Sequence, residues 1–215
     1  MLASLIVIGF AMHITAPLES PRILQLFREA LKSGSKDTYR RIEERTARLS
    51  AELGCPHPYL GIESLTGSKE VWWLNGYTSA AERKQVVDDY PRNTRLLAAL
   101  KENSQRKASL TGKAAEIFAN YRPGLTVGVP WILGHGRVPV ITVMKSNRRI
   151  NGPVFEATDG TRFVVMPART RKEANAVAAA AGPASNVFAV RPSWSFPAKE
   201  WVAGDKLFWR PSSWP

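Results

Sequence analysis

The sequence predicts an α+β fold in which helices cover one face of an antiparallel sheet. An aromatic strand at residues 71–77 passes directly into a capped helix, and a hairpin-sized turn at residues 66–69 joins it to the strand before it. The 215 residues, 44% of them hydrophobic, suffice for one large domain or two small ones. We therefore expect a globular chain whose first half is built on that sheet.

The first half divides into short apolar runs and one clear helix. Residues 22–32 fit a strand and a helix equally well, because so short an apolar run satisfies both periodicities. After Ser35, a predicted N-cap, apolar residues recur at helical spacing until Gly54 ends the helix. Strands at residues 59–65 and 71–77 follow.

The next helix opens with a capping box, in which the Ser79 hydroxyl and the Glu82 carboxylate bind exposed backbone N–H groups. Pro91 predicts a kink or a break, and a strand at residues 116–121 closes the unit. If residues 22–32 form a strand, the order is strand, helix, strand, strand, helix, strand. That order is the ferredoxin-like βαββαβ arrangement, whose bare sheet face needs a cover.

Residues 125–215 repeat this order in part. A hairpin turns at Asp159-Gly160, and a second capping box, TRKE, opens an alanine-rich helix that ends at Gly182. We expect a second ferredoxin-like or related half, with two sheets packed as an α/β barrel in one chain. In the alternative, this half is an appended module and a homodimer completes the barrel. The predicted strands are 139–144, 152–157, 161–166 and 186–191.

The chain is thus expected to have three parts: an N-terminal apolar segment and linker at 1–21, a ferredoxin-like domain at 22–124, and a second α+β half at 125–215. The second half ends in an aromatic tail that we expect to fold back over apolar surface. A partner-binding patch is the alternative, since aromatic residues are enriched at interfaces. The tail residues are Trp194, Phe196, Trp201, Phe208, Trp209 and Trp214.

The N-terminus and the cysteine content bear on localisation. A single cysteine, Cys55, excludes an internal disulfide and agrees with a reducing compartment. Residues 1–12 are apolar but too few to span a bilayer. A true start at Met12 or a buried strand explains them, and a secretory signal cleaved near Ala16 is the alternative. We expect a cytoplasmic protein without a membrane span.

The formal net charge of +12 raises the question of a polyanionic partner. Residues 1–124 hold 18 Lys+Arg and 13 Asp+Glu, while residues 125–215 hold 12 and 5. These charges occur singly or in pairs, without the long runs of a basic tail. We therefore expect no nucleic-acid partner.

The strand at residues 71–77 supplies a candidate ligand face. Alternation puts Trp73, Asn75 and Tyr77 on one side, and on the neighbouring strand Tyr59 and Glu63 share a side. An aromatic-walled pocket carrying Asn75 and Glu63 would bind a flat organic ligand and orient or deprotonate it. The alternative is that these aromatic residues fill the core, with their polar tips hydrogen-bonded.

The run EVWWLNGYTSAAERKQV, followed by Tyr90-Pro91 and a long helix, resembles the dimeric α/β-barrel superfamily. That superfamily includes antibiotic-biosynthesis-type monooxygenases and NIPSNAP-like proteins, and the resemblance covers residues 22–122. It implies a sheet-to-sheet barrel, often formed by a homodimer, with a pocket between sheet and helices. It is compatible with several activities. Haem-degrading members use an axial histidine that the second predicted helix here lacks, so we expect no cofactor.

Histidines and a basic cluster give further candidates. His13, His57 and His135 lack metal-ligand spacing, so the sequence predicts no metal site. Lying between two glycines, His135 has an uncrowded backbone that suits a general base or a ligand contact, or a plain loop.

Three cations, Arg169, Arg171 and Lys172, lie at the start of the alanine-rich helix, where the macrodipole disfavours positive charge. A bound carboxylate or phosphate would make them an anion site, and solvated surface is the alternative.

Three functions stay open. The first, which the resemblance implies, is a cofactor-independent monooxygenase-like enzyme that acts on a small aromatic or anionic organic molecule. The second is a non-catalytic ligand-binding or structural α/β-barrel protein, and the third is a polyanion binder. The sequence contains no GxGxxG, Walker-type or GxSxG motif, which removes the main support for nucleotide binding and serine hydrolysis.

Overall fold

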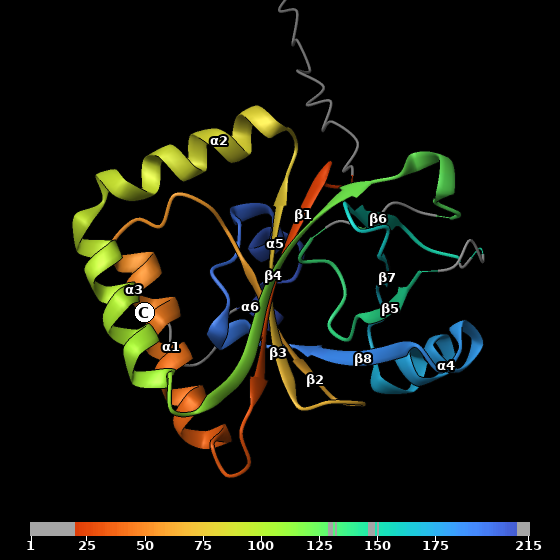
Figure 1. Ribbon diagram of the computed structural model, residues 1–215, viewed down its shortest axis with the longest axis horizontal. Coiled ribbons are helices and arrows are strands. Elements are labelled where there is room, and N and C mark those ends of the chain that lie inside the picture. Colours follow the sequence, from red (N-terminus) through yellow and green to blue (C-terminus); the bar gives the residue numbers. More distant parts are fainter. Residues whose placement is uncertain (1–19, 129–130, 132, 146–148, 150, 210–215) are drawn as a thin grey trace, which may run out of the picture.

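Eight antiparallel strands close into one barrel in the computed structural model of the chain (Figure 1), and helices pack outside it. The structure describes residues 20–128, 131, 133–145, 149 and 151–209. The predictions for the apolar N-terminal segment, its start at Met12, His13 and Trp214 fall outside these residues. The fold is therefore α+β, as predicted, and the barrel is its central feature.

The first half contributes four strands and three helices. Residues 22–32, which fitted both strand and helix, lie mostly in β1, because Leu24 and Leu26 alternate into a buried core while their neighbours face the other way. Its strands, in chain order, are β1 (Ile23–Leu31), β2 (Leu60–Ser64), β3 (Glu70–Tyr77) and β4 (Thr111–Tyr121). Its helices are α1 (Lys36–Glu52), α2 (Ala80–Asp89) and α3 (Thr94–Lys107).

Helix boundaries follow the predicted capping chemistry and the predicted break at Pro91, with one difference, at Ser35. The Ser79 hydroxyl accepts the Glu82 N–H at 3.0 Å, and the Glu82 carboxylate accepts the Thr78 N–H, as expected of a capping box. Ser35 occupies the N-cap of α1, but its side chain makes no capping bond. Pro91 breaks the predicted second helix into α2 and α3 through a 3₁₀ turn, η1 (Tyr90–Arg92).

The second half contributes the other four strands. The strand order around the barrel is β1-β3-β2-β8-β5-β7-β6-β4, so each half is a contiguous sheet. The strands are β5 (Val140–Met144), β6 (Val154–Ala157), β7 (Arg162–Met166) and β8 (Ser185–Val190). The helices are α4 (Arg171–Ala181), α5 (Lys199–Gly204) and α6 (Lys206–Trp209), and two 3₁₀ turns, η2 (Pro123–Leu125) and η3 (Pro192–Trp194), follow β4 and β8.

The two sheets join edge to edge within the chain. Strand β2 pairs with β8, with Ile62 opposite Val190, and β4 pairs with β6, with Ala119 opposite Ala157. This confirms the expectation of two sheets in one chain. The alternative, in which a second chain completes the barrel, is wrong, because strands of this chain occupy both edges.

The barrel interior holds an apolar core. Leu74 and Phe155 are fully buried in it, and Trp72 is only 3% exposed. The aromatic tail folds back as predicted, since Trp201 and Trp209 pack into this core. Figure 1 shows α1, α2 and α3 on one side of the barrel and α4 on the other.

Candidate functional site

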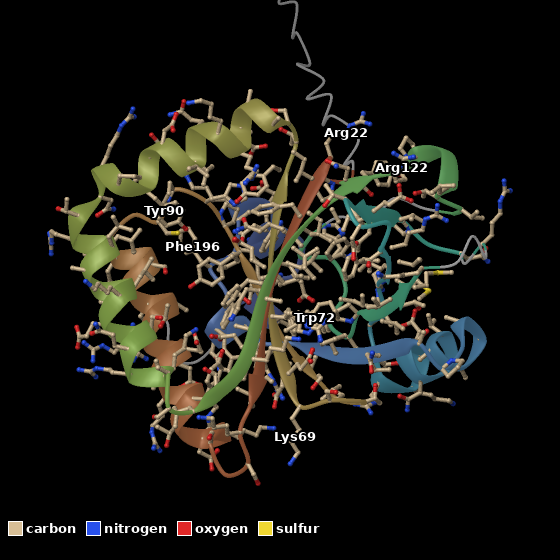
Figure 2. The ribbon with its side chains drawn as sticks, in the orientation of Figure 1. Arg22, Lys69, Trp72, Tyr90, Arg122 and Phe196 are labelled. Carbon is tan, nitrogen blue, oxygen red and sulfur yellow. The ribbon has the colours of Figure 1, made fainter. Side chains whose placement is uncertain are left out.

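A cavity of about 350 Å³ lies between the outer face of the first sheet and the helices α1 and α3. We call it the helix-side cavity. Tyr90, at the junction of α2 and α3, lies on this side of the sheet (Figure 2). The residues of its wall used below are Phe27, Glu29, Glu43, Ser50, Cys55, Tyr59, Trp73, Asn75, Tyr90, Asn103 and Lys107.

Strand alternation determines which side chains reach this cavity. Trp72 and Leu74 of β3 point into the barrel core, so Trp73 and Asn75 point outward, toward the helices. Tyr59, just before β2, lies beside them, with its ring edge-on to Trp73 at 5.8 Å. Three of the predicted site residues, Tyr59, Trp73 and Asn75, thus line one cavity.

A buried cluster of charged groups forms one wall. The Lys107 Nζ lies 3.0 Å from Glu29 Oε2 and 2.8 Å from Glu43 Oε1. The Tyr39 hydroxyl donates to Glu29 Oε2 at 2.6 Å. Glu29 and Glu43 are only 5% and 2% exposed, so two carboxylates share one cation almost out of contact with water. Lys107 also lies over the rings of Tyr39 and Trp73.

Burial and mutual charge shift the proton affinities of this cluster. Burial raises the pKa of the Glu43 carboxyl, and the attraction of Lys107 only partly offsets it. Burial acts to lower the pKa of Lys107, but the two carboxylates outweigh it, so that pKa is raised. Burial and the same carboxylates raise the pKa of Tyr39. Glu43 is therefore a buried carboxyl with a raised pKa that lines a cavity, a combination found at functional sites and in structural ion-pair clusters.

Neutral hydrogen bonds fix the remaining walls. The Ser50 and Tyr59 hydroxyls lie 3.1 Å apart, and the Cys55 thiol lies 3.3 Å from the Tyr90 hydroxyl. The Asn75 amide donates to the Pro58 carbonyl at 3.2 Å. Two walls hold buried polar atoms that lack a hydrogen-bond partner among the described residues, Trp73 Nε1 and Asn103 Oδ1. Such atoms are uncommon in folded proteins and are found where a site has a further role.

A second groove of about 350 Å³ adjoins the helix-side cavity, because Asn75 and Tyr90 line both. Tyr77, another predicted site residue, lies in this groove and donates to Gln25 Oε1 at 2.7 Å. Its ring stacks on His57 with centroids 4.5 Å apart. The predicted face is thus divided between two neighbouring compartments.

Glu63 does not join them. It is 6% exposed, and Arg191 Nε lies 2.7 Å from its Oε2 and Lys36 Nζ lies 2.7 Å from its Oε1. Arg191 follows β8, so the pair ties the second sheet to the first where β2 and β8 meet. Because both oxygens are engaged, the expectation that Glu63 lies in the aromatic pocket is wrong, and Glu63 holds the two sheets together instead.

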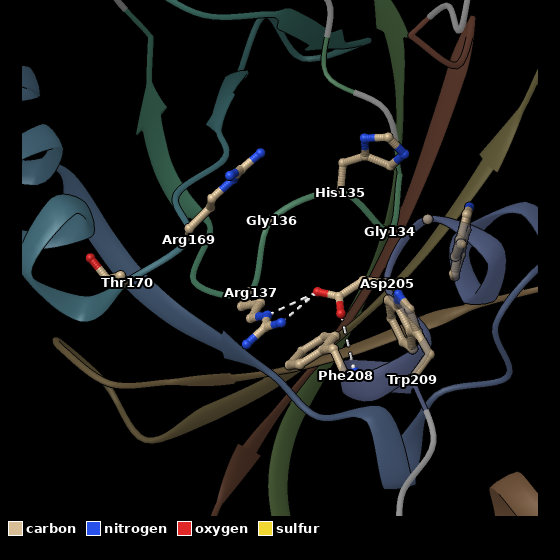
Figure 3. A pocket seen from close by; sticks show the side chains of 11 residues that line it. Gly134, His135, Gly136, Arg137, Arg169, Thr170, Asp205, Phe208 and Trp209 are labelled. Atoms are coloured by element: carbon tan, nitrogen blue, oxygen red, sulfur yellow. Dashed lines mark hydrogen bonds and ion pairs between the residues drawn. The ribbon is translucent and has the colours of Figure 1, made fainter.

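The remaining predicted residues lie around another cavity, of about 500 Å³, which Figure 3 shows. We call it the loop cavity. His135 and Arg169 line it, together with Arg137, Asp205 and aromatic residues of α5 and α6. Arg171 and Lys172 do not line it. Of the three predicted cations, Arg169 thus lines the loop cavity, while Arg171 and Lys172 do not.

Sequence reasoning missed the charged cluster. The predicted apolar face of this first helix consists of Tyr39, Ile42, Thr46, Leu49 and Leu53. Of these, Tyr39 is among the buried positions of α1, and the others there are Glu43, Ala47 and Ser50. A signal was present, because these four residues also recur at helical spacing. Glu29 lies on β1 and Lys107 at the end of α3, 78 residues away, so no local pattern joins them.

Among the described residues, no three His, Cys, Asp or Glu side chains come together as metal ligands. Within the same ranges, no helix combines the length and the apolar character that crossing a bilayer requires.

The fold and the cavity together define an α+β closed-barrel protein with a ligand-sized space under its helices. No protein-family profile matches the chain, and no curated protein matches it. Among solved structures, a "putative monooxygenase" from Fusobacterium nucleatum is 9% identical, with a TM-score of 0.48 over 80% of this chain and 93% of that one. Another "putative monooxygenase", from Lactobacillus acidophilus, is 8% identical, with a TM-score of 0.45 over 88% and 89%.

Proposed function

We propose that the chain binds a small flat aromatic molecule in the helix-side cavity and removes a proton from it, with Glu43 as the general base. The observation that carries this proposal is the position of Glu43, a 2% exposed carboxyl with a raised pKa that lines a cavity walled by aromatic rings. Active sites concentrate such carboxyls because a base must hold its proton near the working pH.

Each neighbour has a role in this proposal. Tyr59 and Trp73 form the flat walls, and Asn75, fixed by its bond to the Pro58 carbonyl, orients the ligand. Lys107, 2.8 Å from Glu43, stabilises the negative charge that appears on the ligand when the proton leaves. A volume of about 350 Å³ lies within the range of small-molecule sites and holds two fused rings.

We further propose that the two halves are both ferredoxin-like. The strand order of the two sheets supports this. The first sheet has the order β4-β1-β3-β2 and the second the order β8-β5-β7-β6, so in each half the strands lie in the order fourth, first, third, second as counted along the chain. The second half differs in having no helix among the described residues between β5 and β6. A homodimer is not needed to close this barrel, and association of two chains remains a proposal.

The resemblance of residues 22–122 to cofactor-independent oxygenases supports oxygenation as the following step. In that reaction the deprotonated substrate itself supplies the electrons: an acidic CH₂ group becomes C=O, one atom of O₂ enters the product, and the other leaves as water. The residues of the helix-side cavity would contribute the proton removal, the orientation and the exclusion of water.

Hydrogen exchange tests the proton step without depending on oxygen. The probe is 2-tetralone, a bicyclic ketone with an acidic CH₂ group, incubated with the full chain in heavy water and followed by NMR. Glu43→Gln should slow the protein-dependent exchange by about 100-fold or more. Glu52→Gln, an exposed change on the same helix, should leave it unaltered. Because the base must be ionised, the rate should rise with pH through a pKa above that of an ordinary glutamate.

A binding-only role is the second candidate. It is favoured by the contacts that Lys107 and Tyr39 already make to the carboxylates, since structural ion-pair clusters also shift pKa values. In that case 2-naphthol binds the cavity, and Glu43→Gln leaves the exchange of 2-tetralone unchanged. Absence of binding by both compounds would exclude the helix-side cavity as a site for molecules of this class.

A further inference from the structure

The loop cavity lies apart from the helix-side cavity and has different walls. It is bounded by the loop at residues 134–137, by the segment that enters α4 at residues 169–170, and by α5 and α6. Figure 3 shows the side chains of Arg169 and His135 on one side of the opening, and Arg137, Asp205 and Phe208 on the other. At about 500 Å³ it is large enough for a small organic molecule.

One of its two arginines is already neutralised. The Arg137 guanidinium donates twice to Asp205 Oδ2, at 3.0 and 2.7 Å, and lies over the Phe208 ring at 4.9 Å. The other oxygen, Asp205 Oδ1, accepts the Phe208 N–H at 3.2 Å. These bonds hold the pKa of Asp205 below its usual value. Arg137 and Asp205 thus form a closed, neutral pair.

Arg169 is different, because its guanidinium has no ion pair among the described residues. Asp205 is the cavity's acidic residue, and Arg137 holds it. The positive charge of Arg169 reaches the cavity, where it adds to the lowering of the pKa of Asp205. The loop cavity therefore carries one uncompensated positive charge, which an anion would satisfy.

The backbone N–H groups at the N-terminus of α4 do not bind the anion. The Glu173 carboxylate accepts the Arg169 N–H at 2.8 Å, and the Thr170 hydroxyl accepts the Glu173 N–H at 3.2 Å. A carboxylate of the chain itself thus occupies the helix N-terminus. Arg171 is engaged elsewhere, with its Nε donating to Asn175 Oδ1 at 2.9 Å. An anion in this cavity must be held by side chains, in particular by Arg169.

Aromatic residues form the opposing wall. The rings of Trp201 and Trp209 contact each other at a tilt of 41° with centroids 5.7 Å apart, and Phe208 meets Trp209 edge-on at 5.2 Å. The loop is fitted to this wall, since a Cβ on Gly134, whose φ is +86°, would lie 2.3 Å from the Trp201 ring. A ligand with an apolar ring can therefore lie on a rigid surface while its charged end reaches Arg169.

We propose that the loop cavity binds a small aromatic carboxylate. The carboxylate pairs with the Arg169 guanidinium and accepts a hydrogen bond from the His135 imidazole, while the ring packs against Phe208 and Trp209. Nothing in this proposal depends on Glu43 or on proton transfer in the helix-side cavity, so the two sites can be tested separately.

Calorimetric titration of the full chain with 2-naphthoate tests this site. The uncharged 2-naphthamide, with the same ring, should bind at least about tenfold more weakly, because it cannot pair with the guanidinium. Arg169→Gln should weaken the binding of 2-naphthoate by the same factor of at least about ten. The matched changes Arg171→Gln and Lys172→Gln, at exposed cations two and three residues further along the chain that do not line the cavity, should alter the affinity for 2-naphthoate less than about twofold.

Three results would overturn the proposal. Equal binding of naphthoate and naphthamide would show that charge plays no part. If all three substitutions reduced the affinity for 2-naphthoate equally, the ligand would be attracted by the overall positive charge of this surface and not by Arg169 in particular. Competition separates the two cavities: saturating 2-naphthol should leave the 2-naphthoate affinity unchanged, and full displacement would place the carboxylate in the helix-side cavity instead.

Discussion

Replacing Lys107 with methionine is the sharpest test of the buried cluster, because methionine keeps most of the side-chain volume and removes only the charge. Lys107 is the single cation between Glu29 and Glu43, at 3.0 and 2.8 Å. At an effective dielectric of about 20, each of these attractions amounts to about 6 kcal/mol. Removing the three charged groups from water costs several kcal/mol per ion, and this cost offsets much of the attraction. We expect a net loss of about 3–5 kcal/mol in the free energy of unfolding, the range found when one partner of a buried pair is removed.

The loss should depend on pH in a defined direction. Burial raises the pKa of Glu43, and removing Lys107 takes away the attraction that partly offsets this rise, so the Glu43 carboxyl holds its proton more tightly in the folded chain than in the unfolded chain. A group whose pKa is raised on folding stabilises the fold fully below its unfolded pKa, and this stabilisation is lost as the pH rises through the folded pKa. The penalty of Lys107→Met should therefore be smaller at pH 5 than at pH 8, by at least about 1 kcal/mol.

Urea unfolding of the four variants of a double-mutant cycle measures this coupling. Glu43→Gln alone should cost less than about 1 kcal/mol, because the remaining Glu29 and Lys107 form a balanced pair. In the Lys107→Met background the same change should recover about 2 kcal/mol, since it removes one of two unpaired carboxylates. Lys101→Met, an exposed change on α3, is the control. A penalty equal to that of Lys101→Met, unchanged between pH 5 and pH 8, would refute the reasoning.

Three further predictions concern other parts of the fold. Gly134→Ala should destabilise the chain by at least about 2 kcal/mol more than Gly160→Ala in urea unfolding, because both positions have positive φ but only the first places a Cβ against Trp201. Cys55, buried and with its pKa raised by burial, should react with an aromatic disulfide reagent at least about 100-fold more slowly than free cysteine, and more slowly still with 2-naphthol bound. Tyr90→Ala should join the helix-side cavity to the adjoining groove, so that the variant, unlike the natural chain, binds the larger 1-hydroxypyrene in a fluorescence titration.

Local signals predicted the elements of the fold well. Capping boxes at Ser79 and Thr170 marked the starts of α2 and α4, and the turn at Asp159-Gly160 marked a hairpin, because these residues act on backbone groups within a few positions. Strand β1 could not be distinguished from a helix by its own residues. Pairing with β3 and β4 on either side makes it a strand, and such pairing is a property of the whole sheet.

The candidate site was only partly predictable for the same reason. Alternation correctly grouped Trp73 with Asn75, because both lie on one strand. It also grouped Glu63 with Tyr59, but it could not show that Arg191, from the other half of the chain, engages Glu63. The pairing of Lys107 with Glu29 and Glu43 brings together three separate elements, and it appears only once α1 and α3 pack on the sheet.

The two halves of the barrel show that the buried charges are not a requirement of the fold. In the second half, the outer face of the sheet is apolar: Val140 of β5 and Val164 of β7 pack directly under α4, whose Ala174 is fully buried. At the corresponding places of the strand order, β1 and β3 of the first half carry Glu29 and Asn75, and a cavity separates the sheet from its helices. An apolar face would stabilise the first half at least as well, since buried ion pairs seldom outperform well-packed hydrophobic residues. Because one chain contains both kinds of sheet face, the polar face of the first half supports the proposal of a ligand in the helix-side cavity.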